Sequence, residues 1–99
     1  MLDLLDKAMF DPHLNQSFEL TLAAGERLSL ELIQTRALGS ETVPHAKRKP
    51  FALVFRGPSS PALPQQIYPL ENPAFARLEI FLVPVGKDGE GIHYEAVFT

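Results

Sequence analysis

The stretch Leu78-Glu79-Ile80-Phe81-Leu82-Val83-Pro84-Val85 is the longest apolar run in the sequence, and the prediction of the fold starts from it. Side chains alternate between the two sides of a β-strand. Leu78, Ile80 and Leu82 therefore share one face, and Phe81, Val83 and Val85 share the other. Because both faces are apolar beyond Glu79, the pattern predicts a strand covered on both sides, in the middle of a small barrel or sandwich.

Length and composition are those of one globular domain. The chain has 99 residues, of which 45% are apolar and 21% are charged. The absence of cysteine excludes disulfides, thiolate nucleophiles and cysteine-ligated zinc. A net charge of −3 argues against a nucleic-acid binder. Residues 1–9 lack the features of a signal peptide, and no stretch approaches the ~20 apolar residues that span a bilayer. We therefore expect a soluble, cytoplasmic protein.

The first residues predict a short helix that precedes the β-domain. Leu2, Leu5 and Met9 fall on one side of such a helix, and Asp11-Pro12 is expected to end it. A helix this short is stable only when it packs on something, so we expect it to close one end of the domain; docking to a partner is the alternative. The expected organisation is a single domain over residues 1–99, with helix and linker over 1–12 and the β-domain over 17–99.

Six segments show strand patterns, and together they predict an all-β fold: a small antiparallel six-stranded barrel or sandwich with a short N-terminal helix. The apolar phase of the second strand slips at Ile33, which predicts a β-bulge. Asp88-Gly89 predicts a type I′ hairpin. The strands are expected at residues 18–22, from residue 28 through the bulge, and at 51–56, 67–70, 78–85 and 92–98.

Two of these strands allow more specific predictions. Prolines are frequent in residues 63–73, and proline cannot donate to a β-ladder, so 67–70 is expected to be an edge strand. Pro69 would protect that edge against pairing with other chains. In the last strand, Tyr94 and Phe98 are expected in the core and His93 on the opposite face.

No arrangement of residues predicts catalysis, a cofactor site or a metal site. His13, His45 and His93 are far apart and form no ligand pair, and no serine lies in a nucleophile motif. The carboxylates of Glu71, Glu79 and Glu95 could approach one another, but surface pairs with Arg56 or Arg77 are the simpler interpretation. Lys47-Arg48-Lys49 could meet a phosphate, although three charges are few for such a role. The prediction is that the protein is not an enzyme.

Several segments carry a family resemblance. They are Pro50-Phe51-Ala52-Leu53-Val54-Phe55-Arg56-Gly57-Pro58, Leu63-Pro64-Gln65, Tyr68-Pro69-Leu70-Glu71, Ile80-Phe81-Leu82-Val83-Pro84-Val85-Gly86 and Tyr94-Glu95-Ala96-Val97-Phe98. The pattern resembles a family of short bacterial proteins classed as a domain of unknown function, from about His13 to Phe98. The resemblance implies a stand-alone all-β protein with no assigned activity or cofactor, and an accessory role beside a phage-tail-like protein system. A glycine is expected where this chain has Ala76 or Arg77.

Recognition of another protein is the remaining class of function. Arg56, Gln65, Gln66 and Tyr68 lie at or near expected loops, and Tyr and Arg are enriched at interface hot spots, so these four form the candidate interaction surface. We expect a protein-interaction or assembly module whose partner is a protein or a second copy, without nucleic acid, membrane or metal. The alternative is a small-ligand-binding barrel, or an enzyme, with a cavity at one end.

Overall fold

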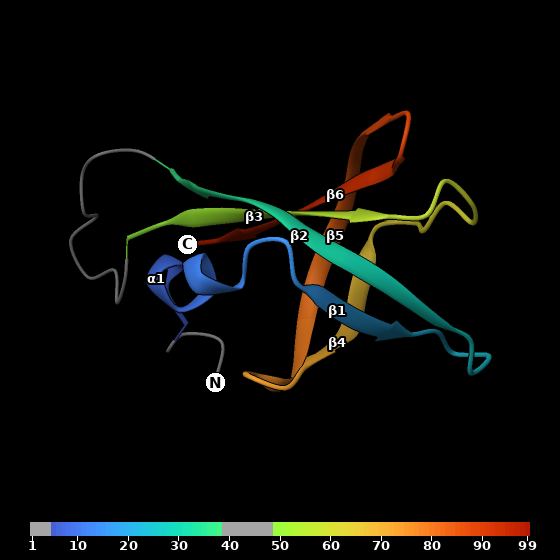
Figure 1. Cartoon of the computed structure of the whole chain (residues 1–99), viewed down its shortest axis with the longest axis horizontal. Coiled ribbons are helices and arrows are strands. Elements are labelled where there is room, and N and C mark those ends of the chain that lie inside the picture. Colours follow the sequence, from blue (N-terminus) through green and yellow to red (C-terminus); the bar gives the residue numbers. More distant parts are fainter. Residues whose placement is uncertain (1–4, 39–48) are drawn as a thin grey trace.

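The computed structural model describes residues 5–38 and 49–99, and the described strands form one closed antiparallel barrel (Figure 1). A one-turn helix and a 3-10 turn precede the barrel, and the first strand begins at Ser17. The elements are α1 (Lys7–Phe10), η2 (Asp11–His13), β1 (Ser17–Thr21), β2 (Arg27–Ala37), β3 (Phe51–Gly57), β4 (Gln66–Asn72), β5 (Ala76–Asp88) and β6 (Gly91–Phe98).

The strand order around the barrel is β1-β2-β3-β6-β5-β4, and β4 returns to β1. This architecture confirms the predicted all-β fold with six antiparallel strands and a short N-terminal helix. The β-bulge expected at Ile33 is also present, because the register of β2 against β3 shifts between Leu32 and Gln34. A second shift, between Pro84 and Gly86 of β5, was not predicted. Such bulges bend strands around a small barrel.

The prediction that β5 is covered on both faces is wrong. Leu78, Ile80 and Leu82 face the core, but Phe81 and Val85 on the other side are about half exposed. Closing the sheet into a barrel buries only its inner face, so the second apolar face of β5 points to solvent. The strand that is buried on both sides is β3, where the outward-facing Ala52 and Val54 are also covered.

The end of β5 differs from the prediction in a second respect. The hairpin lies where Asp88-Gly89 placed it, with Asp88 opposite Gly91, but the positive φ is found at Gly91 and not at the two turn positions that a type I′ turn requires. The carboxylate of Asp88 stabilises this turn by accepting hydrogen bonds from the backbone N–H groups of Glu90 and Gly91. The hairpin is therefore held by a side chain in addition to its backbone.

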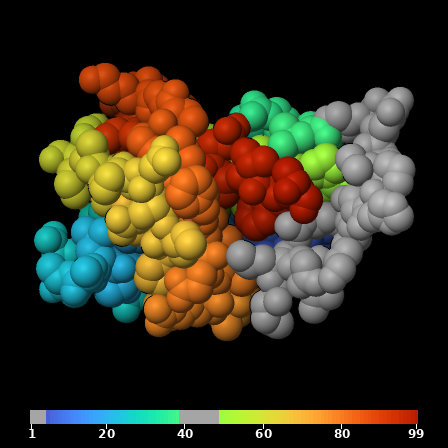
Figure 2. Space-filling view, turned by 180° about the vertical axis from the view of Figure 1, so that it is seen from behind, coloured from blue at the N-terminus to red at the C-terminus, as the bar shows by residue number. Residues whose placement is uncertain are grey.

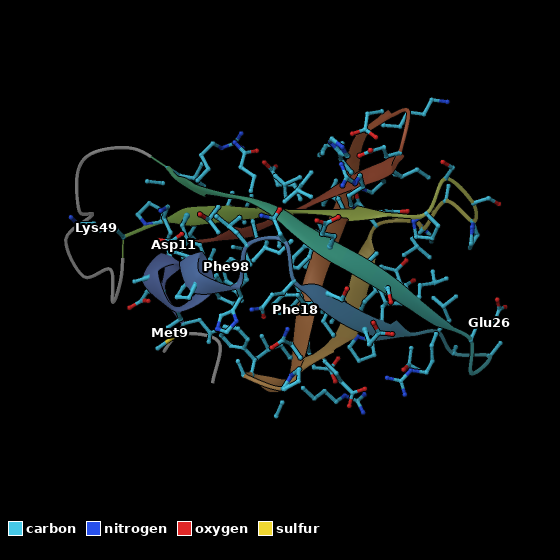
Figure 3. The ribbon with its side chains drawn as sticks, in the orientation of Figure 1. Met9, Asp11, Phe18, Glu26, Lys49 and Phe98 are labelled. Carbon is cyan, nitrogen blue, oxygen red and sulfur yellow. The ribbon has the colours of Figure 1, made fainter. Side chains whose placement is uncertain are left out.

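The N-terminal helix closes one end of the barrel, and the predicted apolar stripe is confirmed in part: Leu5 packs against the core, but the helix buries Phe10 in place of Met9. Phe10 is fully buried and its ring stacks on Phe75 at 4.5 Å between centroids, whereas Met9 is 44% exposed. Leu2, the first residue of the predicted stripe, lies outside the described residues. The α-helix ends at Phe10, directly before Asp11-Pro12 as predicted, and these two residues begin η2. The rings of Phe10 and Phe98 lie 6.2 Å apart between centroids, and Figure 3 shows Phe98 beside the helix.

Asp11 connects this closing segment to β2. Its carboxylate accepts a hydrogen bond from the Thr35 hydroxyl at 2.5 Å and forms an ion pair with Lys7 at 3.1 Å. These two interactions, the Thr35 hydrogen bond first, hold the pKa of Asp11 below its usual value of 3.8. The short helix is thus attached to the barrel by both apolar and polar contacts.

The opposite end of the barrel is closed by the chain between β3 and β4. Leu63 is buried there, and its backbone N–H donates to the Tyr94 hydroxyl at 2.9 Å. The Tyr68 hydroxyl donates to the Pro64 carbonyl oxygen at 2.5 Å. Tyr94 and Phe98 are core residues, as predicted. Tyr68 was expected near a loop at the surface and is instead 2% exposed, because the chain that precedes β4 folds over it.

Candidate interaction surface

Three apolar side chains are exposed on the outside of β4, β5 and β6, and we call Ile67, Phe81 and Val97 together the apolar face. Val97 is opposite Ala52 on β3, beyond the last residue pair of β5 with β6. Ile67 on β4 is directly opposite Phe81 on β5. Their side chains are 61% and 49% exposed, and Val97 on β6 is 55% exposed. Figure 2 shows the three strands side by side from this direction, with β4 in yellow, β5 in orange and β6 in red. The residues that alternate with these three point inward and form the core, so the apolar face has a rigid support.

Beside this face, β4 and β1 are only partly paired with each other. All seven residues of β4 pair with β5, but only Leu70 and Glu71 pair with β1, opposite Leu20 and Glu19. Residues 66–69 of β4 have no strand partner on the β1 side in the described structure. We call this gap, between residues 66–69 and the Leu22-Ala23 turn, the open seam.

A cavity of about 410 Å³ occupies the open seam. It is lined by Thr21, Leu22, Ala23, Gln66, Ile67, Tyr68, Pro69, Glu71 and Arg77. The strand β4 was predicted to be an edge strand, which is corrected by the closed barrel: it has a neighbour on both sides. The prediction holds for part of β4, because residues 66–69 do not pair with β1. This unpaired part ends at Pro69, the residue that was expected to interrupt pairing.

The charged side chains around the open seam already pair with one another. Arg27 on β2 lies 3.6 Å from Glu71 on β4, and Arg77 lies 3.3 Å from Glu79 along β5. All four side chains are about half exposed or more. The surroundings of the seam are therefore close to electrically neutral, with no excess of one charge to select a charged ligand.

Arg56 lies in a separate ionic cluster on β3. Its guanidinium is 2.9 Å from Glu31, 2.8 Å from Glu90 and 3.7 Å from Asp88. The hydrogen bond with Glu31 is the main reason that the pKa of Arg56 is raised. His93 lies 2.8 Å from Asp88, and the pKa of Asp88 is lowered by the Glu90 backbone N–H and then by His93. This cluster fastens the β5–β6 hairpin to the barrel.

The four residues predicted for the interaction surface are not brought together as one patch. Gln65 and Gln66 are exposed, and Gln66 lines the open seam. Arg56 sits on β3, which is separated from β4 by β6 and β5. Tyr68 is one of the residues that line the seam cavity, although its side chain is buried. Sequence reasoning missed Ile67, Phe81 and Val97; the second apolar face of β5 was the signal for them.

The structure also places most of the residues that were considered for catalysis, metal binding and phosphate binding. Glu71, Glu79 and Glu95 lie in separate pairs with Arg27, Arg77 and Arg36. Among the described residues, no group of three or more His, Cys, Asp and Glu side chains is placed to hold a metal ion. His45, Lys47 and Arg48 lie outside the described part of the chain, and Lys49 is exposed. Within residues 5–38 and 49–99, no helix is long and apolar enough to cross a membrane.

Comparison with known proteins identifies a family and nothing more specific. Searches of curated proteins and of solved structures found no match. A family model described as "Domain of unknown function (DUF6916)" matches residues 5–98, which is nearly the whole chain and includes α1 and all the described strands. The protein belongs to this family of domains of unknown function.

Proposed function

We propose that this protein is a non-enzymatic protein-interaction module and that the apolar face of Ile67, Phe81 and Val97 is its docking surface. The observation that carries the proposal is the cross-strand pair of Ile67 and Phe81, which are opposite each other and 61% and 49% exposed. Large apolar side chains gathered on a rigid sheet are typical of surfaces that bind another protein.

The energetics favour covering this face. An aromatic side chain has about 150–250 Å² of surface, so a half-exposed Phe81 leaves about 100 Å² to be buried by a partner. At about 25 cal/mol per Å², that area contributes about 2.5 kcal/mol to binding. Supporting the non-enzymatic assignment, the carboxylates that could act as acids or bases are instead engaged by arginines. The resemblance noted in the sequence implies a partner from a phage-tail-like protein system, and we include this partner in the proposal.

The proposal is tested by comparing two substitutions on β5. Phe81→Ser removes the centre of the apolar face. Val85→Ser is the matched control, because Val85 is similarly exposed on the same strand but lies in the bulge and has no partner on β4. Tagged wild-type protein and both variants are used for pull-downs from the host, beside light scattering on the purified chains. Circular dichroism and urea unfolding establish that each variant is folded.

We expect one stoichiometric partner that the wild type and Val85→Ser retain and Phe81→Ser loses. Two results would overturn the proposal. One is a monomeric chain that captures no protein under any condition. The other is a partner that Phe81→Ser still binds with unchanged affinity, because the apolar face would then have no part in recognition.

A further inference from the structure

We propose that the open seam is a strand-acceptor site, in which an extended segment of the partner protein adds to β4 beside residues 66–69. The proposal rests on the proposed function and specifies the chemistry of its partner: a neutral peptide segment in β conformation, with apolar side chains at alternate positions. Recognition would use main-chain hydrogen bonds for affinity and side-chain contacts for selectivity.

The first argument is the unequal pairing of the two sides of β4. Seven residues pair with β5, and two pair with β1. Residues 66–69 therefore span about 13 Å of strand edge, at about 3.3 Å per residue. Backbone groups of successive strand residues point to opposite sides, so Ile67 faces the seam with its N–H and C=O, and Pro69 with its C=O alone. Backbone N–H and C=O groups are strong hydrogen-bonding groups, and an unpaired strand edge is a template for another extended chain.

The second argument is that β1 cannot close this gap in the folded protein. The Leu22 N–H donates to the Glu26 carbonyl at 2.8 Å, and the Leu22 carbonyl accepts from the Gly25 N–H at 2.8 Å. Both backbone groups of Leu22 are thus committed to the β1–β2 hairpin. Figure 1 shows β1 and β4 separating from the place where they pair. Pro69 stands at this point and has no N–H to extend the ladder toward β1.

The third argument is space. The open seam holds a cavity of about 410 Å³ between the two strand edges, walled by Leu22 and Ala23 on one side and by residues 66–69 on the other. Side chains of an added strand alternate between two directions. Those on the outside would lie beside Ile67, and those on the inside would enter the cavity above Tyr68. The added strand would thereby cover part of the apolar face.

The area of the apolar face selects this occupant over a second copy that packs flat against it. Stable interfaces bury about 800 Å² on each partner. Phe81 supplies about 100 Å², and the smaller Ile67 and Val97 supply less than that each, so the three together offer far less than this area. Main-chain hydrogen bonds along the seam add binding energy that does not depend on that small area. The mutual pairing of Arg27 with Glu71 and of Arg77 with Glu79 favours a neutral segment.

The experiment selects random twelve-residue peptides displayed on phage against the immobilised full chain. The best peptide is then synthesised unmodified and in two N-methylated forms, with methyl groups at alternate backbone amides in either phase. In an added strand, only one phase of N–H groups faces β4. We expect one N-methylated form to lose at least about tenfold in affinity while the other binds as the parent does, because only the first loses ladder hydrogen bonds.

Substitutions in the protein locate the site. Ala23→Arg places a long side chain in the cavity, and Ala24→Arg is the matched control, because Ala24 is the next residue of the same turn and does not line the cavity. We expect Ala23→Arg to weaken peptide binding at least about tenfold and Ala24→Arg to leave it unchanged. Hydrogen exchange at the Ile67 backbone amide, which faces the seam, should slow when the peptide is bound.

Several outcomes would overturn the strand-acceptor site: no peptide is enriched, both N-methylated forms bind as the parent does, or Ala23→Arg binds normally. The proposed function is judged separately by Phe81→Ser. A partner or peptide lost with Phe81→Ser and retained with Ala23→Arg would leave the apolar face as the docking surface and eliminate the seam. Loss with both substitutions, together with the N-methylation asymmetry, supports both proposals.

Discussion

Arg36 on β2 forms an ion pair with Glu95 on β6 across the outside of β3, with 2.6 Å between Nη2 and Oε2. These two strands are not neighbours, since β3 lies between them. Arg36 is opposite Ala52, and Glu95 is opposite Val54, so the pair crosses the two outward-facing residues of β3. This bridge explains why a strand on the wall of a barrel is buried on both faces.

Arg36→Ala should therefore destabilise the protein by about 1 kcal/mol, more than an isolated surface ion pair would, because Val54 also becomes exposed. Urea unfolding measures the free energy. Arg77→Ala is the control: Arg77 pairs with Glu79 on the same strand and covers no core residue, so its loss should change stability by less than about 0.5 kcal/mol. Equal effects of the two substitutions would contradict the covering role of Arg36.

Gly91→Ala should destabilise the β5–β6 hairpin strongly. A Cβ atom at Gly91 would lie 1.9 Å from the Gly57 carbonyl oxygen, and the φ of 157° is unfavourable for other residues. We expect a loss of about 2–3 kcal/mol, measured by urea unfolding. Gly86→Ala on β5, in the same hairpin, is the control, since nothing lies within 4 Å of its Cβ position. Unchanged stability of Gly91→Ala would show that the hairpin can move away from Gly57.

Phe10→Ala tests whether the N-terminal segment is an integral part of the core. The Phe10 ring is fully buried and stacks on Phe75, so its removal leaves a cavity and should cost about 3–5 kcal/mol in thermal or urea unfolding. Met9→Ala, one residue away and 44% exposed, should cost less than about 1 kcal/mol. Similar small effects at both positions would mean that the helix does not close the barrel in solution.

Asp11 should contribute a pH-dependent part of the stability. Its pKa is lowered in the folded protein, so the folded state binds fewer protons than the unfolded state in the acid range. The stabilisation is therefore present above the unfolded pKa, near the usual 3.8, and is lost as the pH falls through the lower folded value.

Urea unfolding at about pH 6 and about pH 3 measures this contribution. The wild type should lose more stability between the two than Asp11→Asn does. The loss for Thr35→Val should be intermediate. This variant lacks the Thr35 hydroxyl, which is the main cause of the lowered pKa of Asp11, but keeps the interaction of Asp11 with Lys7. If all three proteins lose the same free energy of unfolding between the two pH values, the acid sensitivity comes from other carboxylates.

Local patterns in the chain were sufficient to predict most elements. The alternation around Leu20 and Leu30, the phase slip at Ile33 and the core positions of Tyr94 and Phe98 all match the structure. Each depends on residues close together in sequence, because side chains alternate with a period of two along any strand. The helix stripe was only partly right because a single turn contains too few residues to define a period, and Phe10 was overlooked.

The candidate site was much less predictable. Tyr68 is buried because residues 61–64 fold over it, and Phe81 is exposed because its strand becomes part of a closed barrel wall. The open seam exists because Leu22 bonds to its own hairpin while β4 continues past it. None of these outcomes can be predicted from the alternation of apolar and polar residues within a single segment.

The sequence by itself determined that this is a small all-β domain, where most of its strands run, and the inward-facing side of β5. Those properties follow from local backbone geometry and from the burial of apolar side chains. Only the tertiary structure decided which second face stays exposed, which ion pair covers β3 and where the barrel wall remains unpaired. Those depend on which strands become neighbours, because an exposed face or a free strand edge is defined only when the surrounding chain has closed around it.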